Sequence, residues 1–134
     1  MRPKKPVAMN LVAAFLVGGA ISEVGQIIQW VFLRQGLSPE KASTPTAIVL
    51  IGLSALFTGL GWYDRLTKLG GMGASLPITG FANAMVAPAM EFRAEGLVLG
   101  VGARLFTVAG PVLAWGMAAA FVVGLVRLVF GVAI

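Results

Sequence analysis

The side chains of this sequence that could do chemistry are polar residues set inside long apolar runs. One group, Ser22, Glu23, Gln26 and Gln29, lies within the first apolar run. On an α-helix Ser22, Gln26 and Gln29 share one face, with Glu23 at its margin. Such a stripe inside a membrane span either holds neighbouring helices together or lines a polar path. Glu23 favours the polar path, because a carboxylate at membrane depth is costly unless it is paired, protonated or hydrated.

A second polar group, Ser75, Thr79 and Asn83, lies in the apolar but glycine- and proline-rich segment Gly70–Phe92. A helix that breaks at membrane depth exposes backbone N–H and C=O groups, which then need protein, water or a ligand as partners. Such segments often line solute or ion sites, although a kink required only for packing uses the same residue types. The expected backbone breaks in this segment are Gly73, Pro77, Gly80 and Pro88.

The same segment can offer partners to both an anion and a cation. Thr79 or Gly80 can cap a helix that begins near Phe81. The start of that helix would present free N–H groups and a positive dipole end to a carboxylate or a phosphate. Pro88 removes the donor for the carbonyl of Ala84, and a freed carbonyl can ligate a cation.

Arg104 is the remaining polar candidate. It lies in Leu97–Ala109, a run of about 20 Å that is too short to span a bilayer. We expect a backbone break at Gly110 and Pro111 to separate this half-helix from the last span. A guanidinium at membrane depth must find a carboxylate, a carbonyl or water. Arg104 is therefore expected either to lie near Glu23 or to reach the lipid head groups from a shallow half-helix.

The composition fixes the class of protein that holds these residues. Hydrophobic residues make up 58% of the chain and charged residues 11%, against roughly 45–50% and 25% in soluble domains. This indicates an integral membrane protein. The net charge of +5 comes from bases scattered at the ends of apolar runs, a pattern typical of membrane topology and not of nucleic-acid binding.

The residue types also exclude several kinds of site. The chain has no cysteine and no histidine, which excludes disulfides, thiolate and imidazole metal ligands, and histidine-based catalysis. Ser75 has no convincing base to activate it as a nucleophile. We therefore expect no catalytic residue, no resident metal and no cofactor.

The elements that position the candidates are all helical. We expect a single all-α, polytopic membrane domain with three full spans and additional broken or re-entrant half-helices. Arg2, Lys4, Lys5, Arg65 and Lys68 fall on one side if the first two spans alternate, which predicts a cytoplasmic N-terminus; the sequence does not fix the side of the turn at 91–96. The expected segments are a basic tail at 1–6, spans at 7–33 and 47–62, the broken segment at 70–92, the half-helix at 97–109 and a span at 111–134.

Longer motifs resemble one known family. Residues 71–112, GMGASLPITGFANAMVAPAMEFRAEGLVLGVGARLFTVAGPV, look like the signature region of the SpoVA membrane proteins of spore-forming bacteria. The runs FLVGGAISEVGQ at 15–26 and LFTGLGWYD at 56–64 resemble the motifs of that family's first two helices. The EFRAEG and AGPV segments favour the AC type of the family over the AE type, which shares the PxTGFxN core.

The resemblance implies a function. It implies a channel subunit that moves dipicolinic acid, as its calcium chelate, across the inner membrane of the bacterial spore during sporulation and germination. The implied partners are an AE-type membrane subunit, a soluble AD-type dipicolinate-binding subunit and other SpoVA proteins, in a lipid bilayer. Two alternatives stay open: a mechanosensitive channel of low solute specificity, and a structural membrane anchor for the soluble partners.

Overall fold

The computed structural model describes residues 7–131, so the basic tail at 1–6 and the end of the expected last span lie outside the described residues. Within that part the chain is helical and has no strand. Three helical runs, Val7–Arg34, Pro39–Gly59 and Leu97–Phe130, are long and apolar enough to cross a membrane, which confirms the expected all-α membrane fold with three spans. The elements in chain order are α1 (Val7–Arg34), α2 (Pro39–Gly59), α3 (Tyr63–Gly70), α4 (Met72–Ser75), α5 (Ile78–Glu91), a 3-10 turn η1 (Arg93–Glu95), a π-helical turn η2 (Leu97–Gly102) and α6 (Ala103–Phe130).

The second span begins earlier than the sequence indicated. Ser38 is extended, with φ −67° and ψ 155°, and Pro39 and Glu40 form the first turn of α2. Pro at the first helical position and an acidic residue in the first turn are favourable helix-start features. The stretch 34–46 between the expected spans is therefore mostly helix, and Pro45 lies inside α2 instead of ahead of it.

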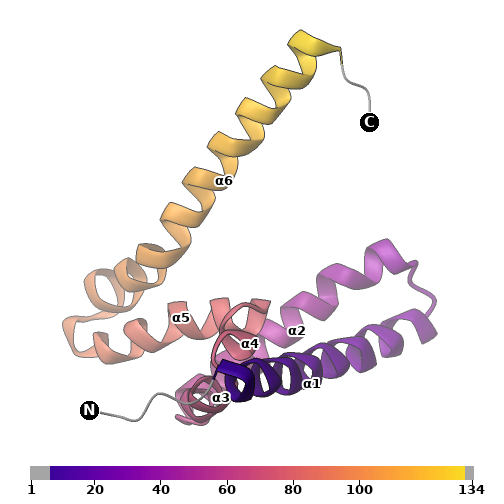
Figure 1. The fold of residues 1–134 in the computed structure, drawn as a ribbon. Helices are drawn as coiled ribbons and strands as arrows, with labels where there is room; N and C mark the ends of the chain where they lie inside the picture. The colour runs from indigo at the N-terminus through magenta and orange to yellow at the C-terminus, as the bar shows by residue number, and fades with distance from the viewer. Residues whose placement is uncertain (1–6, 132–134) are drawn as a thin grey trace.

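The first two spans form an antiparallel pair. A short turn, in which Gly36 has φ +91°, reverses the chain between α1 and α2 (Figure 1). The two helices approach closely at Gly25, where an added Cβ would lie 3.3 Å from Leu50 Cδ1. Both residues lie away from the ends of their helices, so this contact falls within both apolar spans.

The segment α3–α4–α5 packs onto this pair as a re-entrant unit. Gly71, with φ +50°, separates α3 from α4, and Pro77, with ψ 162°, separates α4 from α5. The backbone of Gly73 lies directly on α1, because an added Cβ would be 2.0 Å from the carbonyl oxygen of Ala14. Only a residue without a side chain permits this approach, and it lets α4 pack against α1.

The last helix of this unit, α5, runs parallel to α2. Contacts pair Thr79 with Ser54 and Asn83 with Thr58, and Met90 lies 3.8 Å from the Cβ position of Gly59. Thus α5 starts beside the middle of α2 and ends beside its C-terminal end. The turn at 91–96, whose side the sequence left open, lies at the same end of the molecule as α3.

Of the expected backbone breaks, the one at Pro77 is present and the others are wrong. Gly73 lies inside α4, and Gly80 and Pro88 lie inside α5. Because α6 runs through Gly110 and Pro111 without interruption, the expected half-helix at 97–109 is continuous with the last span. The change at Pro111 is one of packing: Ala109 is buried against the rest of the chain, whereas residues 111–131 are exposed and α6 diverges from α1 and α2 (Figure 1). A helix in an apolar surrounding keeps its remaining backbone hydrogen bonds, because no water is available to replace them.

Candidate solute-contact site

A cavity of about 340 Å³ brings the polar face of α1 together with the start of α5. We call it the polar pocket. On the α5 side it is lined by Pro77 and Ile78, where the chain breaks. Its polar lining residues are Ser22, Gln26 and Gln29 of α1 and Ser43 and Thr46 of α2.

The hydroxyl groups of this pocket already donate their protons to helix carbonyls. Ser22 Oγ donates to the carbonyl of Gly18 at 3.0 Å. Ser43 Oγ donates to the carbonyl of Glu40 at 2.6 Å, and Thr46 Oγ1 to that of Ala42 at 2.7 Å. Each hydroxyl oxygen therefore remains an acceptor toward a ligand.

Donors come from the amides and from the start of α5. The side chains of Gln26 and Gln29 each carry an NH₂ group. At α5 the N–H groups of Gly80 and Phe81 donate to the carbonyl of Pro77 at 2.8 and 3.2 Å, and no side chain caps the helix. The N–H group of Ile78 precedes the intrahelical hydrogen bonds and lies beside the pocket. The pocket thus combines amide donors with hydroxyl and amide oxygens, a set that suits a carboxylate and its bound cation.

The polar pocket lies between the middle parts of two apolar helices, where polar side chains are uncommon. Ile21 and Gly25 near the middle of α1, and Leu50 near the middle of α2, line it together with the polar groups. A backbone break at this depth is tolerated where it lines a protein cavity. Ser22 and Gln26 are exposed in the single chain, so they need water or another protein surface as a neighbour.

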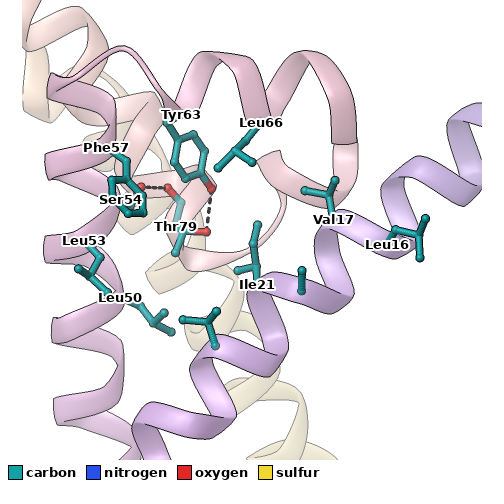
Figure 2. Close-up of a pocket in the computed structure, with 12 residues that line it drawn as sticks. Leu16, Val17, Ile21, Leu50, Leu53, Ser54, Phe57, Tyr63, Leu66 and Thr79 are labelled. Carbon is teal, nitrogen blue, oxygen red and sulfur yellow. Dashed lines mark hydrogen bonds between the residues drawn. The ribbon is translucent and has the colours of Figure 1, made fainter.

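A second cavity, also of about 340 Å³, lies on the other side of Ile21 and Leu50 and is almost wholly apolar (Figure 2). We call it the apolar cavity. Tyr63, Ser54 and Thr79 form its polar wall. All three are buried, with Tyr63 2% exposed.

The polar groups of this wall form hydrogen bonds with one another and with the backbone. The Tyr63 hydroxyl lies 2.9 Å from the carbonyl oxygen of Ala74 and 2.7 Å from the hydroxyl of Thr79. Because the carbonyl cannot donate, Tyr63 donates to Ala74 and Thr79 donates to Tyr63. Ser54 Oγ donates to the carbonyl of Thr79 at 2.5 Å. These bonds tie α2, α3, α4 and α5 together and set the position at which α5 begins.

The other candidates from the sequence do not line the polar pocket. Thr79 belongs to the buried wall described above and does not cap α5. Asn83 Oδ1 accepts from the hydroxyl of Thr58 at 2.8 Å, between α2 and α5. Ser75 is exposed, and its hydroxyl donates to the carbonyl of Gly71 at 3.1 Å.

Of the two positions expected for Arg104, the one beside Glu23 is wrong. The Arg104 guanidinium lies over the ring of Phe92, with Cζ 3.6 Å from the ring centroid. Glu23 is exposed on α1, a helix from which α6 diverges (Figure 1). A cation on an aromatic face is stabilised without a carboxylate, and this contact sets Arg104 at the turn where α6 joins α5.

Sequence reasoning missed several polar residues that shape the two cavities. Ser43 and Thr46 precede the expected second span at 47–62, and Tyr63 directly follows it. Ser54 and Thr58 carried a usable signal, since two hydroxyl residues four positions apart share one face of an apolar helix. That signal indicates a polar seam between helices.

Comparison with known proteins gives two matches. The family model of the SpoVAC/SpoVAEB sporulation membrane proteins matches residues 10–126. The stage V sporulation protein AC of Bacillus subtilis (strain 168) is 47% identical over 130 residues, which cover 96% of this chain and 87% of that protein. No solved structure matches the chain.

Proposed function

The chain belongs to the SpoVAC/SpoVAEB family of sporulation membrane proteins, and from this premise we propose that it is a channel subunit for dipicolinic acid. In this proposal the solute crosses the inner membrane of the spore as its calcium chelate, inward during sporulation and outward during germination. The observation that carries the proposal is the polar pocket, which joins the start of α5 to the amide stripe of α1 at membrane depth.

The chemistry of the pocket supports this cargo. Dipicolinate carries two carboxylates, and its calcium ion prefers oxygen ligands. The amides of Gln26 and Gln29 and the first N–H groups of α5 can donate to a carboxylate. The hydroxyl oxygens of Ser22, Ser43 and Thr46 can accept from water or contact the cation. None of these groups carries a full charge, so the chelate can be bound weakly enough to leave again, as conduction requires.

The fold supports an orientation. Arg65 and Lys68 of α3 lie at one end of the molecule together with Arg93 in the turn at 91–96. Under the positive-inside rule this end is cytoplasmic. The proposed orientation therefore places the N-terminus, α3 and that turn in the cytoplasm, and the turn between α1 and α2 on the opposite side.

The exposed polar residues beside the pocket support the proposal that partner proteins cover this face of α1. Exposed Ser22 and Gln26, together with Glu23, lie inside a membrane span, where contact with lipid is unfavourable. We propose that an AE-type membrane subunit or another SpoVA protein covers this polar face and completes the path. A soluble AD-type dipicolinate-binding subunit would deliver or receive the solute.

Deleting the chain tests the proposal. Spores that lack it are expected to accumulate little dipicolinate, and the wild-type chain supplied from a second locus is expected to restore the content. The measurement is the dipicolinate extracted per spore, normalised to spore number. Normal dipicolinate content and release in the deleted strain would contradict the proposed role. A channel gated by membrane tension without solute specificity would pass unrelated ions in liposomes containing the chain alone.

A further inference from the structure

The apolar cavity carries an inference that is independent of the solute path. We propose that it is a lipid site, which takes one acyl chain of an anionic phospholipid while α3 holds the head group. The cavity is bounded by α1, α2 and α3 (Figure 2).

The lining selects an apolar occupant. Val17, Ile21, Leu50, Leu53 and Leu66 direct aliphatic side chains into one space (Figure 2). The polar groups of its wall already bond one another and the backbone. A polar ligand would lose its bonds to water here without finding new donors or acceptors, whereas an acyl chain has no hydrogen bonds to lose.

The cavity opens toward the bilayer. Leu16 and Val24 of α1 line the cavity, and 62% and 46% of their surface is nevertheless exposed. Both belong to a membrane span, so the surroundings of this opening are lipid tails. The molecules that reach it most readily are therefore lipids of the same leaflet.

The α3 end of the cavity supplies the complementary charge. Leu66 lines the cavity, and its neighbour Arg65 is exposed. Trp62 and Leu69 on the flanks of α3 are 55% and 63% exposed, which is typical of a helix at the membrane interface. An arginine at that level can reach a phosphate while its aliphatic stem stays among lipid tails. One phospholipid can therefore place its tail beside Leu66 and its phosphate near the neighbouring Arg65.

Brominated lipids test this proposal, because bromine quenches nearby tryptophan fluorescence. The three native tryptophans, Trp30, Trp62 and Trp115, are replaced with phenylalanine, and Phe57→Trp is introduced as the reporter at the cavity. Phe121→Trp on the exposed part of α6 is the matched control. Each protein is placed in phosphatidylcholine bilayers that contain increasing fractions of phosphatidylglycerol with brominated chains.

The cavity reporter is expected to be quenched at lower fractions of brominated phosphatidylglycerol than the α6 reporter, which samples bulk lipid. Filling the cavity with Ala20→Phe, or independently with Leu53→Phe, is expected to remove this difference, whereas Ala119→Phe on α6 is expected to leave it unchanged.

The head-group part of the proposal is tested separately. Arg65→Gln is expected to abolish the preference for brominated phosphatidylglycerol over brominated phosphatidylcholine. Lys41→Gln, at the other end of α2, is expected to leave that preference intact.

Equal quenching of the two reporters would overturn the proposal. So would excess quenching that persists in both cavity-filling variants. Loss of quenching at the cavity reporter when a SpoVA partner protein is added, at unchanged lipid composition, would instead assign the cavity to a partner side chain.

Discussion

Replacing Gln26 and Gln29 together with leucine is expected to slow dipicolinate release from germinating spores by at least about tenfold. Each amide is proposed to donate to a carboxylate of the solute, and a hydrogen bond to a charged group contributes roughly 1.5–3 kcal/mol. A change of about 1.4 kcal/mol in an activation free energy changes a rate tenfold. Losing one such hydrogen bond to the passing solute therefore slows release by at least about tenfold. The measurement is the time course of dipicolinate release, followed by terbium fluorescence.

The matched control is Asn10→Leu, which removes an amide from an exposed position of α1 near its beginning. It is expected to release dipicolinate at the wild-type rate. Both variants should be present in the membrane at wild-type levels, since leucine is favourable in a membrane helix. If the double variant releases dipicolinate as fast as the control, the amides of the polar pocket do not contact the solute.

Replacing Gly73 with alanine is expected to prevent the re-entrant unit from packing onto α1. An added Cβ would lie 2.0 Å from the carbonyl oxygen of Ala14 and 2.8 Å from its Cα. Overpacking a core typically costs about 1–3 kcal/mol, and here the clash is with backbone, which cannot rotate away. The expected result is a large loss of thermal stability in detergent, read by the temperature at which the protein aggregates.

Gly52→Ala is the control for this substitution. Gly52 lies within α2, and an added Cβ there would meet nothing within 4 Å. Its stability should equal or exceed that of the wild type, because alanine favours a helix over glycine. A Gly73→Ala protein as stable as the Gly52→Ala protein would show that α4 does not lie against α1 as described.

The fold class could be predicted from the sequence because it depends on composition and length. A chain that is 58% hydrophobic must bury its side chains in lipid. The bounds of the helices were predicted less well, because proline was treated as a break. Pro45, Pro88 and Pro111 all lie inside helices, since in an apolar surrounding the neighbouring backbone bonds have no alternative partners.

The candidate site could be predicted only in its separate parts. The stripe of Ser22, Gln26 and Gln29 followed from helical periodicity, and the break at Pro77 followed from residue type. That the two parts line one pocket depends on how α5 packs against α2, through Ser54, Thr58 and Tyr63. The spacing of Ser54 and Thr58 indicates a polar seam on α2, but no local pattern identifies Thr79 and Asn83 as its partners.

Of the two positions predicted for Arg104, only the one beside Glu23 is wrong. That alternative assumed that a charge in an apolar chain must be neutralised by the only other charge expected at that depth. The structure gives the guanidinium the ring of Phe92, an attraction that needs no opposite charge. Its position at the turn between α5 and α6 also removes the need for a deep partner.

The central claim is that calcium dipicolinate passes the polar pocket, and cysteine accessibility tests it most directly because the native chain has no cysteine. Gln29→Cys is labelled in spore membranes with a negatively charged methanethiosulfonate reagent, and Phe121→Cys on the exposed part of α6 is the control. We predict that Gln29→Cys reacts, that calcium dipicolinate slows its reaction, and that Phe121→Cys stays unlabelled. A Gln29→Cys protein that does not react, or reacts at the same rate with and without calcium dipicolinate, would contradict the claim.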